Sequence, residues 1–352
     1  MNIKQLLQSV IDAEASDLHL VAGIPPTLRK DGELMPIPSA GVLTPDNIED
    51  LLREVLSSEQ VERLTVNKEL DFSLSFSEKG RFRVNAYTQK GSLAAAFRLI
   101  PLTIPSIESL GLPAILHSFT SLRQGFVLVT GPTGHGKSTT LAAMIQEINQ
   151  TRPVHIVTVE DPVEFIFTPV KSIISQREMR SDTHSWEIAL RSALREDPDV
   201  VFIGEMRDYE TIAAALTVAE TGHLVFATLH TNNAAQSIDR IVDVFPEEQQ
   251  QQIRLQLSNV IEAVFSQRLI QSATKGRVVT YEVMLGSMAI RTAIREGKTH
   301  QIESILETSH EIGMSTLERS LADLVKRGMV TLEVAESWSL RPEELTRLIR
   351  TT

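Results

Sequence analysis

The sequence contains no cysteine. Disulfide bonds and zinc sites made of cysteine thiolates are therefore excluded. The sequence also lacks a basic excess, because 34 Lys and Arg residues stand against 45 Asp and Glu residues, giving a net charge of −11. A nucleic-acid-binding surface usually carries a basic excess that neutralises phosphates. The acidic balance thus argues against nucleic acid as the main partner.

Long apolar runs are also missing, and no stretch reaches the length of a membrane-spanning helix. The first residues, Met1–Leu7, show neither the apolar region nor the small-residue cleavage site of a signal peptide. We therefore expect a cytoplasmic protein that another protein holds at any membrane where it works. The 352 residues suffice for about two domains, and 42% of them are hydrophobic, which allows well-packed cores.

The first hundred residues have the patterns of a small α+β domain. Apolar residues near the start, from Leu6 to Ile11, have helical spacing, whereas residues 72–76 and 81–86 alternate as half-buried strands do. Residues 93–100 predict a further strand. The following segment, 101–113, holds three prolines and Gly111, which favours a linker.

Residues 114–352 are expected to form a second domain. Short apolar runs at 126–129, 154–159, 200–203 and 224–229 are separated by helical patterns, which is typical of a parallel sheet covered on both faces. This pattern predicts a RecA-like α/β core. Beyond about residue 288 the pattern is helical, with Ser315 and Glu318 as a possible capping box.

One motif points directly to nucleotide chemistry. Residues 131–138 match G-x-x-x-x-G-K-[ST], between an apolar strand and an amphipathic helix. Glycines let the backbone N–H groups turn around a phosphate, Lys137 supplies a positive charge to it, and the Ser138 hydroxyl can bind Mg²⁺. The predicted ATP-binding residues are Gly131, Pro132, Thr133, Gly134, His135, Gly136, Lys137, Ser138 and Thr139.

Polar residues follow three of the predicted parallel strands, at the sheet edge where ligands bind. Glu205 can orient or deprotonate an attacking water, or it is a solvated acid at a strand end. The acids of segment 160–164, including Glu164, can hold Mg²⁺ through water, or they form a polar turn. His230 is placed to contact a γ-phosphate, or it is structural. Arg83 and Arg98 lie on predicted N-terminal strands. Composition alone does not distinguish them from ordinary solvated arginines.

Four blocks in this order resemble one family closely, the secretion ATPases of type II secretion and type IV pili. They are the phosphate loop, the acidic box 157–165, the Gly204–Glu205 pair and the histidine box 221–230. Residues 289–298 resemble the C-terminal signature of the pilus retraction branch. Pilus assembly and secretion relatives typically add an N-terminal domain and a four-cysteine zinc insert, and the sequence shows neither.

The resemblance implies a hexameric ring whose subunits pair a PAS-like domain, residues 1–100, with the RecA-like domain. ATP would bind between the two domains. By motif, Glu164 helps to position Mg²⁺, Glu205 is the catalytic glutamate and His230 contacts the γ-phosphate. Arg83 and Arg98 match an arginine pair that reaches the nucleotide from the N-terminal domain and stabilises charge on the transferring phosphoryl group.

The resemblance also implies partners and a function. It implies force applied to a polytopic inner-membrane platform protein, pilus retraction by loss of pilin from the fibre base, and association with other pilus ATPases. His135 departs from the family, which usually has serine there, but we expect nucleotide binding to survive because backbone donors do the binding. Three other functions stay open, namely an accessory retraction ATPase, a nucleic-acid translocase and a non-hydrolysing ring subunit.

Overall fold

The computed structural model describes residues 2–30, 32–76, 80–100 and 103–350. The chain divides into two compact units, one formed by residues 1–103 with 162–166 and the other by residues 104–161 with 167–352. The boundaries predicted from the sequence, at residues 100 and 113, stay predictions. Residues 101 and 102 of the predicted linker lie outside the described residues.

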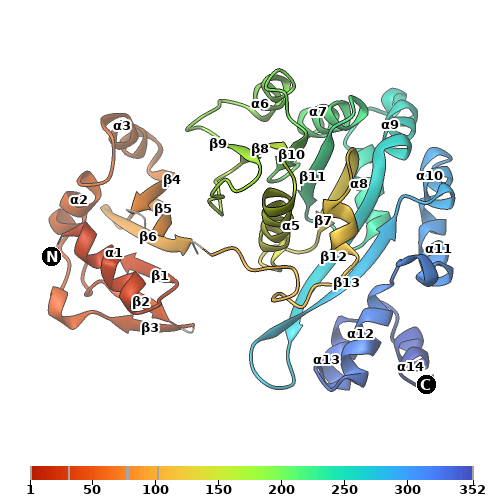
Figure 1. Cartoon of the computed structure of the whole chain (residues 1–352). Helices are drawn as coiled ribbons and strands as arrows, with labels where there is room; N and C mark the ends of the chain where they lie inside the picture. Colours follow the sequence, from red (N-terminus) through yellow and green to blue (C-terminus); the bar gives the residue numbers. More distant parts are fainter. Residues whose placement is uncertain (1, 31, 77–79, 101–102, 351–352) are drawn as a thin grey trace. The chain divides into compact units, whose positions relative to one another are not determined.

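The first unit is a mixed α+β fold (Figure 1). Its described elements are α1 (Ile3–Asp12), β1 (Asp17–Leu20), β2 (Thr27–Lys30), β3 (Glu33–Pro36), a 3-10 helix (Pro38–Ala40), α2 (Pro45–Arg53), α3 (Ser58–Asn67), β4 (Glu69–Phe76), β5 (Gly80–Gln89) and β6 (Ser92–Ile100). The strands pair antiparallel in the order β3-β2-β1-β6-β5-β4. Strands β5 and β6 are therefore interior strands of this sheet.

Local sequence signals explain the first helix and the face of the sheet that it covers. Asn2 accepts a hydrogen bond from the backbone of Gln5, whose side chain accepts one from the Asn2 backbone, and this capping box fixes the start of α1. The apolar residues of α1 share a buried cluster with Phe82 and Phe97 from β5 and β6. Because side chains alternate along a strand, Arg83 and Arg98 point to the opposite face.

The second unit contains most of the chain. Its described elements are α4 (Leu116–Thr120), β7 (Gly125–Thr130), α5 (Lys137–Thr151), β8 (His155–Glu160), β9 (Ile173–Glu178), α6 (Trp186–Ala193), β10 (Val200–Ile203), α7 (Tyr209–Glu220), β11 (Leu224–Leu229), α8 (Ala234–Asp243), α9 (Glu247–Val260), β12 (Ile261–Gln271), β13 (Arg277–Leu285), α10 (Met288–Arg295), a 3-10 helix (Thr299–Gln301), α11 (Ile302–Thr308), a second 3-10 helix (His310–Ile312), α12 (Leu317–Lys326), α13 (Leu332–Trp338) and α14 (Pro342–Arg350).

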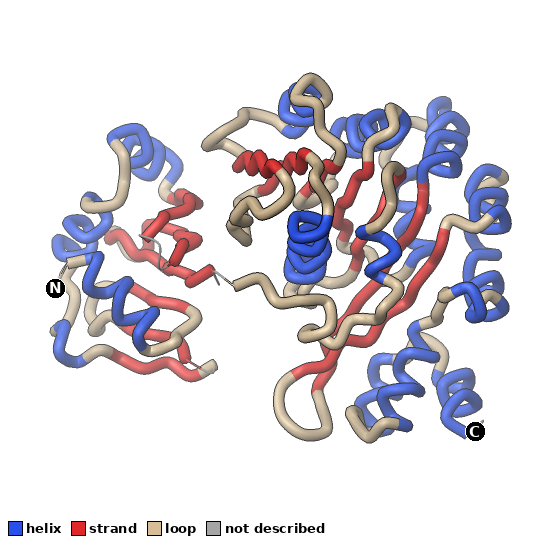
Figure 2. The backbone as a smooth tube through the Cα atoms, in the orientation of Figure 1, coloured by secondary structure: helices blue, strands red, loops and turns tan. Residues whose placement is uncertain are grey.

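A seven-stranded sheet organises this unit, in the order β13-β12-β7-β11-β10-β8-β9. Neighbouring strands from β12 to β9 pair parallel, and β13 pairs antiparallel with β12. The four apolar runs of the sequence are β7, β8, β10 and β11, so the predicted parallel core is confirmed. The fold class is confirmed as well: an α/β core, a smaller α+β unit and a helical C-terminal part (Figure 2).

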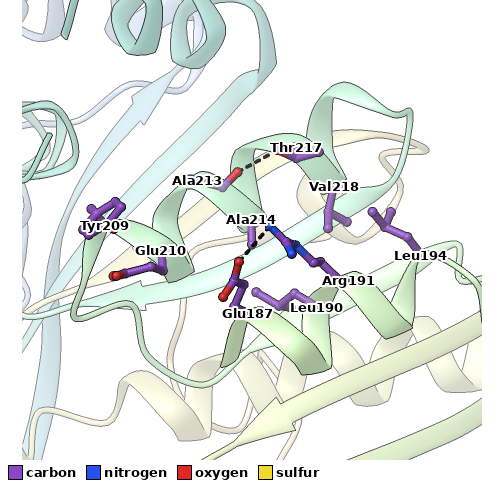
Figure 3. A pocket seen from close by; sticks show the side chains of 10 residues that line it. All are labelled: Glu187, Leu190, Arg191, Leu194, Tyr209, Glu210, Ala213, Ala214, Thr217 and Val218. Carbon is purple, nitrogen blue, oxygen red and sulfur yellow. Dashed lines mark hydrogen bonds and ion pairs between the residues drawn. The ribbon is translucent and has the colours of Figure 1, made fainter. Parts of the chain in front are cut away.

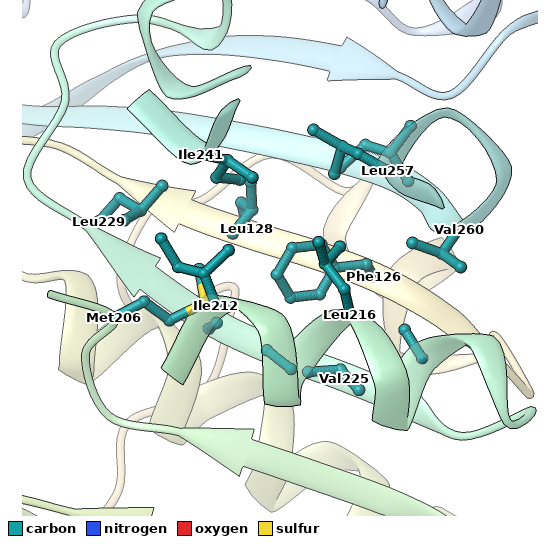
Figure 4. Close-up of a cluster of buried hydrophobic side chains, with 14 of the residues drawn as sticks. Phe126, Leu128, Met206, Ile212, Leu216, Val225, Leu229, Ile241, Leu257 and Val260 are labelled. Carbon is teal, nitrogen blue, oxygen red and sulfur yellow. The ribbon is translucent and has the colours of Figure 1, made fainter. Parts of the chain in front are cut away.

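A large buried cluster lies between this sheet and helices α7, α8 and α9. Phe126 and Leu128 of β7 and Val225 of β11 meet Ile212 of α7 and Leu257 of α9, as Figure 4 shows. Burying side chains of this size contributes roughly 1.5–3 kcal/mol each. This packing fixes β7 and β11, and both strands end at the edge of the sheet where residues 131–138 lie.

Three C-terminal helices, α12 to α14, form a small core of their own against the far ends of β12 and β13. Leu321 of α12 and Leu345 of α14 are fully buried with Ile270 of β12. The capping box predicted at Ser315 is wrong. The residue that caps the start of α12 is Thr316, whose side chain accepts from the backbone N–H of Arg319.

No helix among the described residues is long and apolar enough to cross a membrane.

Candidate nucleotide-binding site

The phosphate loop lies between β7 and α5, and its shape depends on glycine at two points. Gly131 has φ of 142°, and a Cβ there would lie 2.2 Å from the carbonyl oxygen of Gln267 on β12. Gly136, the capping residue just before α5, has φ of 83°. Side-chain-bearing residues rarely adopt these angles, so the loop requires glycine independently of any ligand. The helix start places backbone N–H groups where they can bind a phosphate.

Lys137, the first residue of α5, is buried and turned back onto the loop. Its Nζ donates to the carbonyl oxygens of Gly131, at 2.8 Å, and Pro132, at 3.0 Å. It also lies 3.3 Å from Nδ1 of His230. Because an ammonium only donates, Nδ1 accepts here, and the ring proton lies on Nε2.

The structure brings Glu205 and His230 together with the phosphate loop. Glu205 follows β10 and His230 follows β11, two neighbouring parallel strands. Nε2 of His230 lies 3.0 Å from Oε1 of Glu205, and Nδ1 of His230 lies 3.1 Å from the hydroxyl of Thr133. A chain of contacts therefore runs from Lys137 through His230 to Glu205.

Glu205 has a second partner that the sequence analysis did not assign. Nη2 of Arg207 donates to Oε2 of Glu205 at 2.8 Å. Burial works against the charge of Glu205, but Arg207 and His230 outweigh it and lower the pKa of this carboxyl below its ordinary value. Glu205 is therefore ionised at neutral pH, which a general base requires.

Gly204, just before Glu205, packs closely against the neighbouring strand. A Cβ at this position would lie 3.2 Å from Cα of Glu160 on the neighbouring β8. The Gly204 carbonyl accepts from the hydroxyl of Thr228 on β11, at 2.6 Å. These contacts fix the backbone that carries Glu205.

The acidic box divides between the two units. Glu160 ends β8, is buried, and accepts from the hydroxyl of Thr158 at 2.7 Å. Asp161 lies 3.6 Å from Nη2 of Arg180. Glu164 belongs to segment 162–166, which groups with the first unit. Its part in holding Mg²⁺, like that of Ser138 at the start of α5, stays a prediction.

The two predicted arginines lie directly opposite each other in the first unit. Arg83 on β5 and Arg98 on β6 are register partners. Nε of Arg98 donates to Oδ1 of Asp17 at 2.8 Å, while most of the Arg98 side chain remains exposed. Two cations opposite each other on one sheet face can act together on an anion, and this role too stays a prediction.

His135 makes contacts that its place in the motif did not suggest. Its carbonyl oxygen accepts from Nε2 of Gln267 at 2.7 Å, and its Nδ1 accepts from the backbone N–H of Leu269 at 2.9 Å. Gln267 and Leu269 lie on β12, a strand that the sequence patterns did not predict. Strand β12 thus holds the phosphate loop through hydrogen bonds to His135.

A cavity of about 390 Å³ lies elsewhere in this unit, between α6 and α7. Figure 3 shows its lining, which includes the Glu187–Arg191 ion pair of α6, at 2.7 Å, and Tyr209 of α7. None of its lining residues belongs to the phosphate loop or to the strand ends that carry Glu205 and His230.

Comparison with known proteins agrees with this geometry. The family model described as "Type II/IV secretion system protein" matches residues 1–337. The chain belongs to this family. It is 45% identical to the type IV pilus retraction ATPase PilT of Pseudomonas aeruginosa, over 97% of this chain and 99% of that protein. It is 37% identical to the type IV pilus ATPase PilU of the same organism, over 99% and 92% of the two chains.

Solved structures agree in fold with this family assignment. A crystal structure of the pilus retraction motor PilT with bound ADP matches with a TM-score of 0.93 and 46% identity, covering 99% of both chains. The family is one of ATPases, and this relative binds an adenine nucleotide. A nucleotide-binding ATPase fold is therefore established for this chain as well.

Proposed function

We propose that this chain is the subunit of a hexameric ATP-hydrolysing motor that powers retraction of type IV pili. The observation that carries the proposal is the contact chain Lys137–His230–Glu205, which joins the phosphate loop to two strand ends. The near-complete match to a pilus retraction ATPase supports the biological role.

The proposed chemistry uses groups of this chain around ATP as substrate. Lys137 exchanges its loop carbonyl partners for phosphate oxygens. Glu205 takes a proton from water while the water oxygen forms a bond to the γ-phosphorus and the bond to the β–γ bridging oxygen breaks, releasing ADP and phosphate. His230 contacts the γ-phosphate. Arg83 and Arg98 stabilise the charge that develops on the transferring phosphoryl group.

The loop geometry and the hydroxyl of Ser138 suit Mg²⁺ bound with a nucleotide, with Glu164 as a further ligand, directly or through water. When bound, Mg²⁺ would neutralise charge on the phosphates. In the proposed assembly, residues 1–100 form the PAS-like domain, 101–113 the linker and 114–352 the motor domain. The motor would work on the cytoplasmic side of the inner membrane, against a platform protein and beside other pilus ATPases. No nucleic acid takes part.

The second candidate function is that of an accessory retraction ATPase. Identity to the type IV pilus ATPase PilU is 37%, whereas identity to the retraction ATPase PilT is 45%, and the higher value supports the retraction motor. A nucleic-acid translocase fits less well, since the net charge is −11.

Deletion of the gene in the source organism tests the proposal. We expect the deletion strain to keep its pili but to lose retraction and twitching, and the wild-type gene to restore both. Complementation with Glu205→Gln should fail, and Glu247→Gln, an exposed control on α9, should succeed. Loss of pili in the deletion strain would instead favour an assembly motor.

A further inference from the structure

His135 connects the phosphate loop to two parts of the second unit at once. Its backbone and Nδ1 bond to β12, as described above, through Gln267 and Leu269. Its ring meets the ring of Trp338 edge-on, with 5.7 Å between centroids and 65° between planes. Trp338 ends α13 and packs against the small core of α12 to α14.

Trp338 is also linked, through Arg268, to the segment that follows His230. Its carbonyl oxygen accepts from Nη1 of Arg268 on β12 at 2.9 Å. The other terminal nitrogen of Arg268 lies 3.5 Å from the carbonyl oxygen of Asn232. The phosphate loop and the segment after β11 are therefore both linked to Trp338, the first through the ring of His135 and the second through Arg268.

The hydrogen bonds fix the protonation state of His135. A backbone N–H only donates, so Nδ1 has no proton and the neutral ring carries its proton on Nε2. Burial lowers the pKa of His135, and cations on three packed elements add to this effect: Arg277 of β13, Lys137 of α5 and Arg268 of β12. Protonation would replace the acceptor at Nδ1 with a donor and break the bond to Leu269.

We propose that His135 is a positioning residue that couples occupancy of the phosphate loop to the C-terminal helices α12 to α14 through Trp338. Phosphate binding requires the backbone N–H groups of the phosphate loop to point toward one position. The contacts of His135 hold the loop in this arrangement before the phosphate binds. Because linkage is reciprocal, whatever displaces α13 also changes nucleotide affinity. The inference rests on nucleotide binding alone and goes beyond pilus retraction.

A double-mutant cycle on the full chain tests this coupling with fluorescently labelled ADP. Trp338→Ala and His135→Asn should each weaken ADP binding about three- to tenfold. Without the contact the phosphate loop is more mobile, so ordering it on ADP binding costs more conformational entropy. The ADP affinity of the double variant should be no lower than that of whichever single variant binds ADP more weakly. Both substitutions remove the same contact between His135 and Trp338, so their effects should not add. Trp338→Phe keeps a ring against His135 and should bind within about twofold of the wild type.

A spectroscopic measurement tests the same contact directly. The chain has two tryptophans, so Trp186→Phe leaves Trp338 as the only indole. Its emission should change on addition of ADP, and without ADP it should titrate with a midpoint below the ordinary histidine pKa. Both responses should vanish when His135→Asn is added, because asparagine keeps an acceptor near Leu269 but has no titrating ring.

The outcomes separate this inference from the proposed function. The coupling would be overturned if the wild-type chain binds ADP but the effects of the two single substitutions on ADP affinity add in the double variant. It would also be overturned if the emission of Trp338 does not respond to ADP. Either result would leave the motor assignment intact. Failure of the wild-type chain to bind ADP would overturn both. If His135→Asn does not fold, the ADP affinities of Trp338→Ala and Trp338→Phe can still be compared. Equal affinities in these two variants would contradict the coupling.

Discussion

At the scale of single residues, Glu205 lies between two donors, Arg207 and His230. Both stabilise its ionised form, so it can act as a base at neutral pH. The sequence placed Glu205 and His230 at one sheet edge because parallel strands end together. It did not reveal Arg207 as a partner, since a surface arginine two residues after a glutamate has no distinctive pattern.

We expect Glu205→Gln to keep ADP and ATP binding but to slow phosphate release at least about 100-fold, because the change removes the proton acceptor and little volume. Phosphate release and nucleotide binding, measured on the same preparation, check this. Turnover close to that of the wild type would exclude Glu205 as the base.

Glu282 on β13 is a buried carboxyl with a different consequence. Burial raises its pKa to about 7, although the backbone N–H of Ala234 donates to it at 2.7 Å. Between about pH 4.5 and 7, Glu282 therefore keeps its proton in the folded state, whereas in the unfolded state it has lost it. Stability from this residue is therefore present at the acidic end of that window and is lost as pH rises through it.

Glu282→Gln should remove this pH dependence, since glutamine keeps an acceptor for Ala234 but carries no charge. We expect stabilisation on the order of 1–3 kcal/mol at pH 8 and little difference from the wild type at pH 5. Thermal unfolding at both pH values measures the effect, with Glu247→Gln as the exposed control. A stabilisation that is the same at both pH values would contradict the prediction.

At the scale of elements, the sequence predicted strands whose apolar runs are continuous, namely β7, β8, β10 and β11. It missed β12, which carries polar residues in its middle, although Ser266, Gln267 and Arg268 are all buried. Their partners, such as the Thr130 hydroxyl at 2.8 Å from that of Ser266, lie far away in sequence. Because only the folded chain brings such partners together, local patterns cannot show why polar residues are tolerated there.

The three C-terminal helices depend on a few buried leucines. Leu345→Ala should cost roughly 2–5 kcal/mol within this small core, because it leaves a cavity that α12 and α14 can only partly close. Hydrogen exchange should then become faster in α12 to α14 while α5 and α7 stay protected. Leu340→Ala, at a position 53% exposed, is the matched control and should change neither.

At the scale of the whole molecule, the proposed function assigns roles to residues of each of the two compact units. Sequence motifs alone assigned Arg83 and Arg98, because neither the composition nor the strand pattern distinguishes them from solvated arginines. The structure adds that both lie on interior strands of the first unit, opposite its core.

Arg83→Ala should leave nucleotide binding within about tenfold and reduce turnover by about a thousandfold, since such an arginine acts mainly on the transition state. Labelled-nucleotide binding and steady-state phosphate release check this on the assembled protein. Arg53→Ala removes an exposed ion pair on α2 and should change neither quantity. Equal losses of binding and turnover for Arg83→Ala would make it a structural arginine.

The close approach of β12 to Gly131 has a consequence for genetics. A side chain at residue 131 would collide with the Gln267 backbone even in a chain that never meets ATP. Cells that carry Gly131→Ala would then lack twitching because degradation removes the misfolded protein, so immunoblots of such strains should show low abundance. Glu205→Gln strains, with the same phenotype, should contain normal amounts of protein.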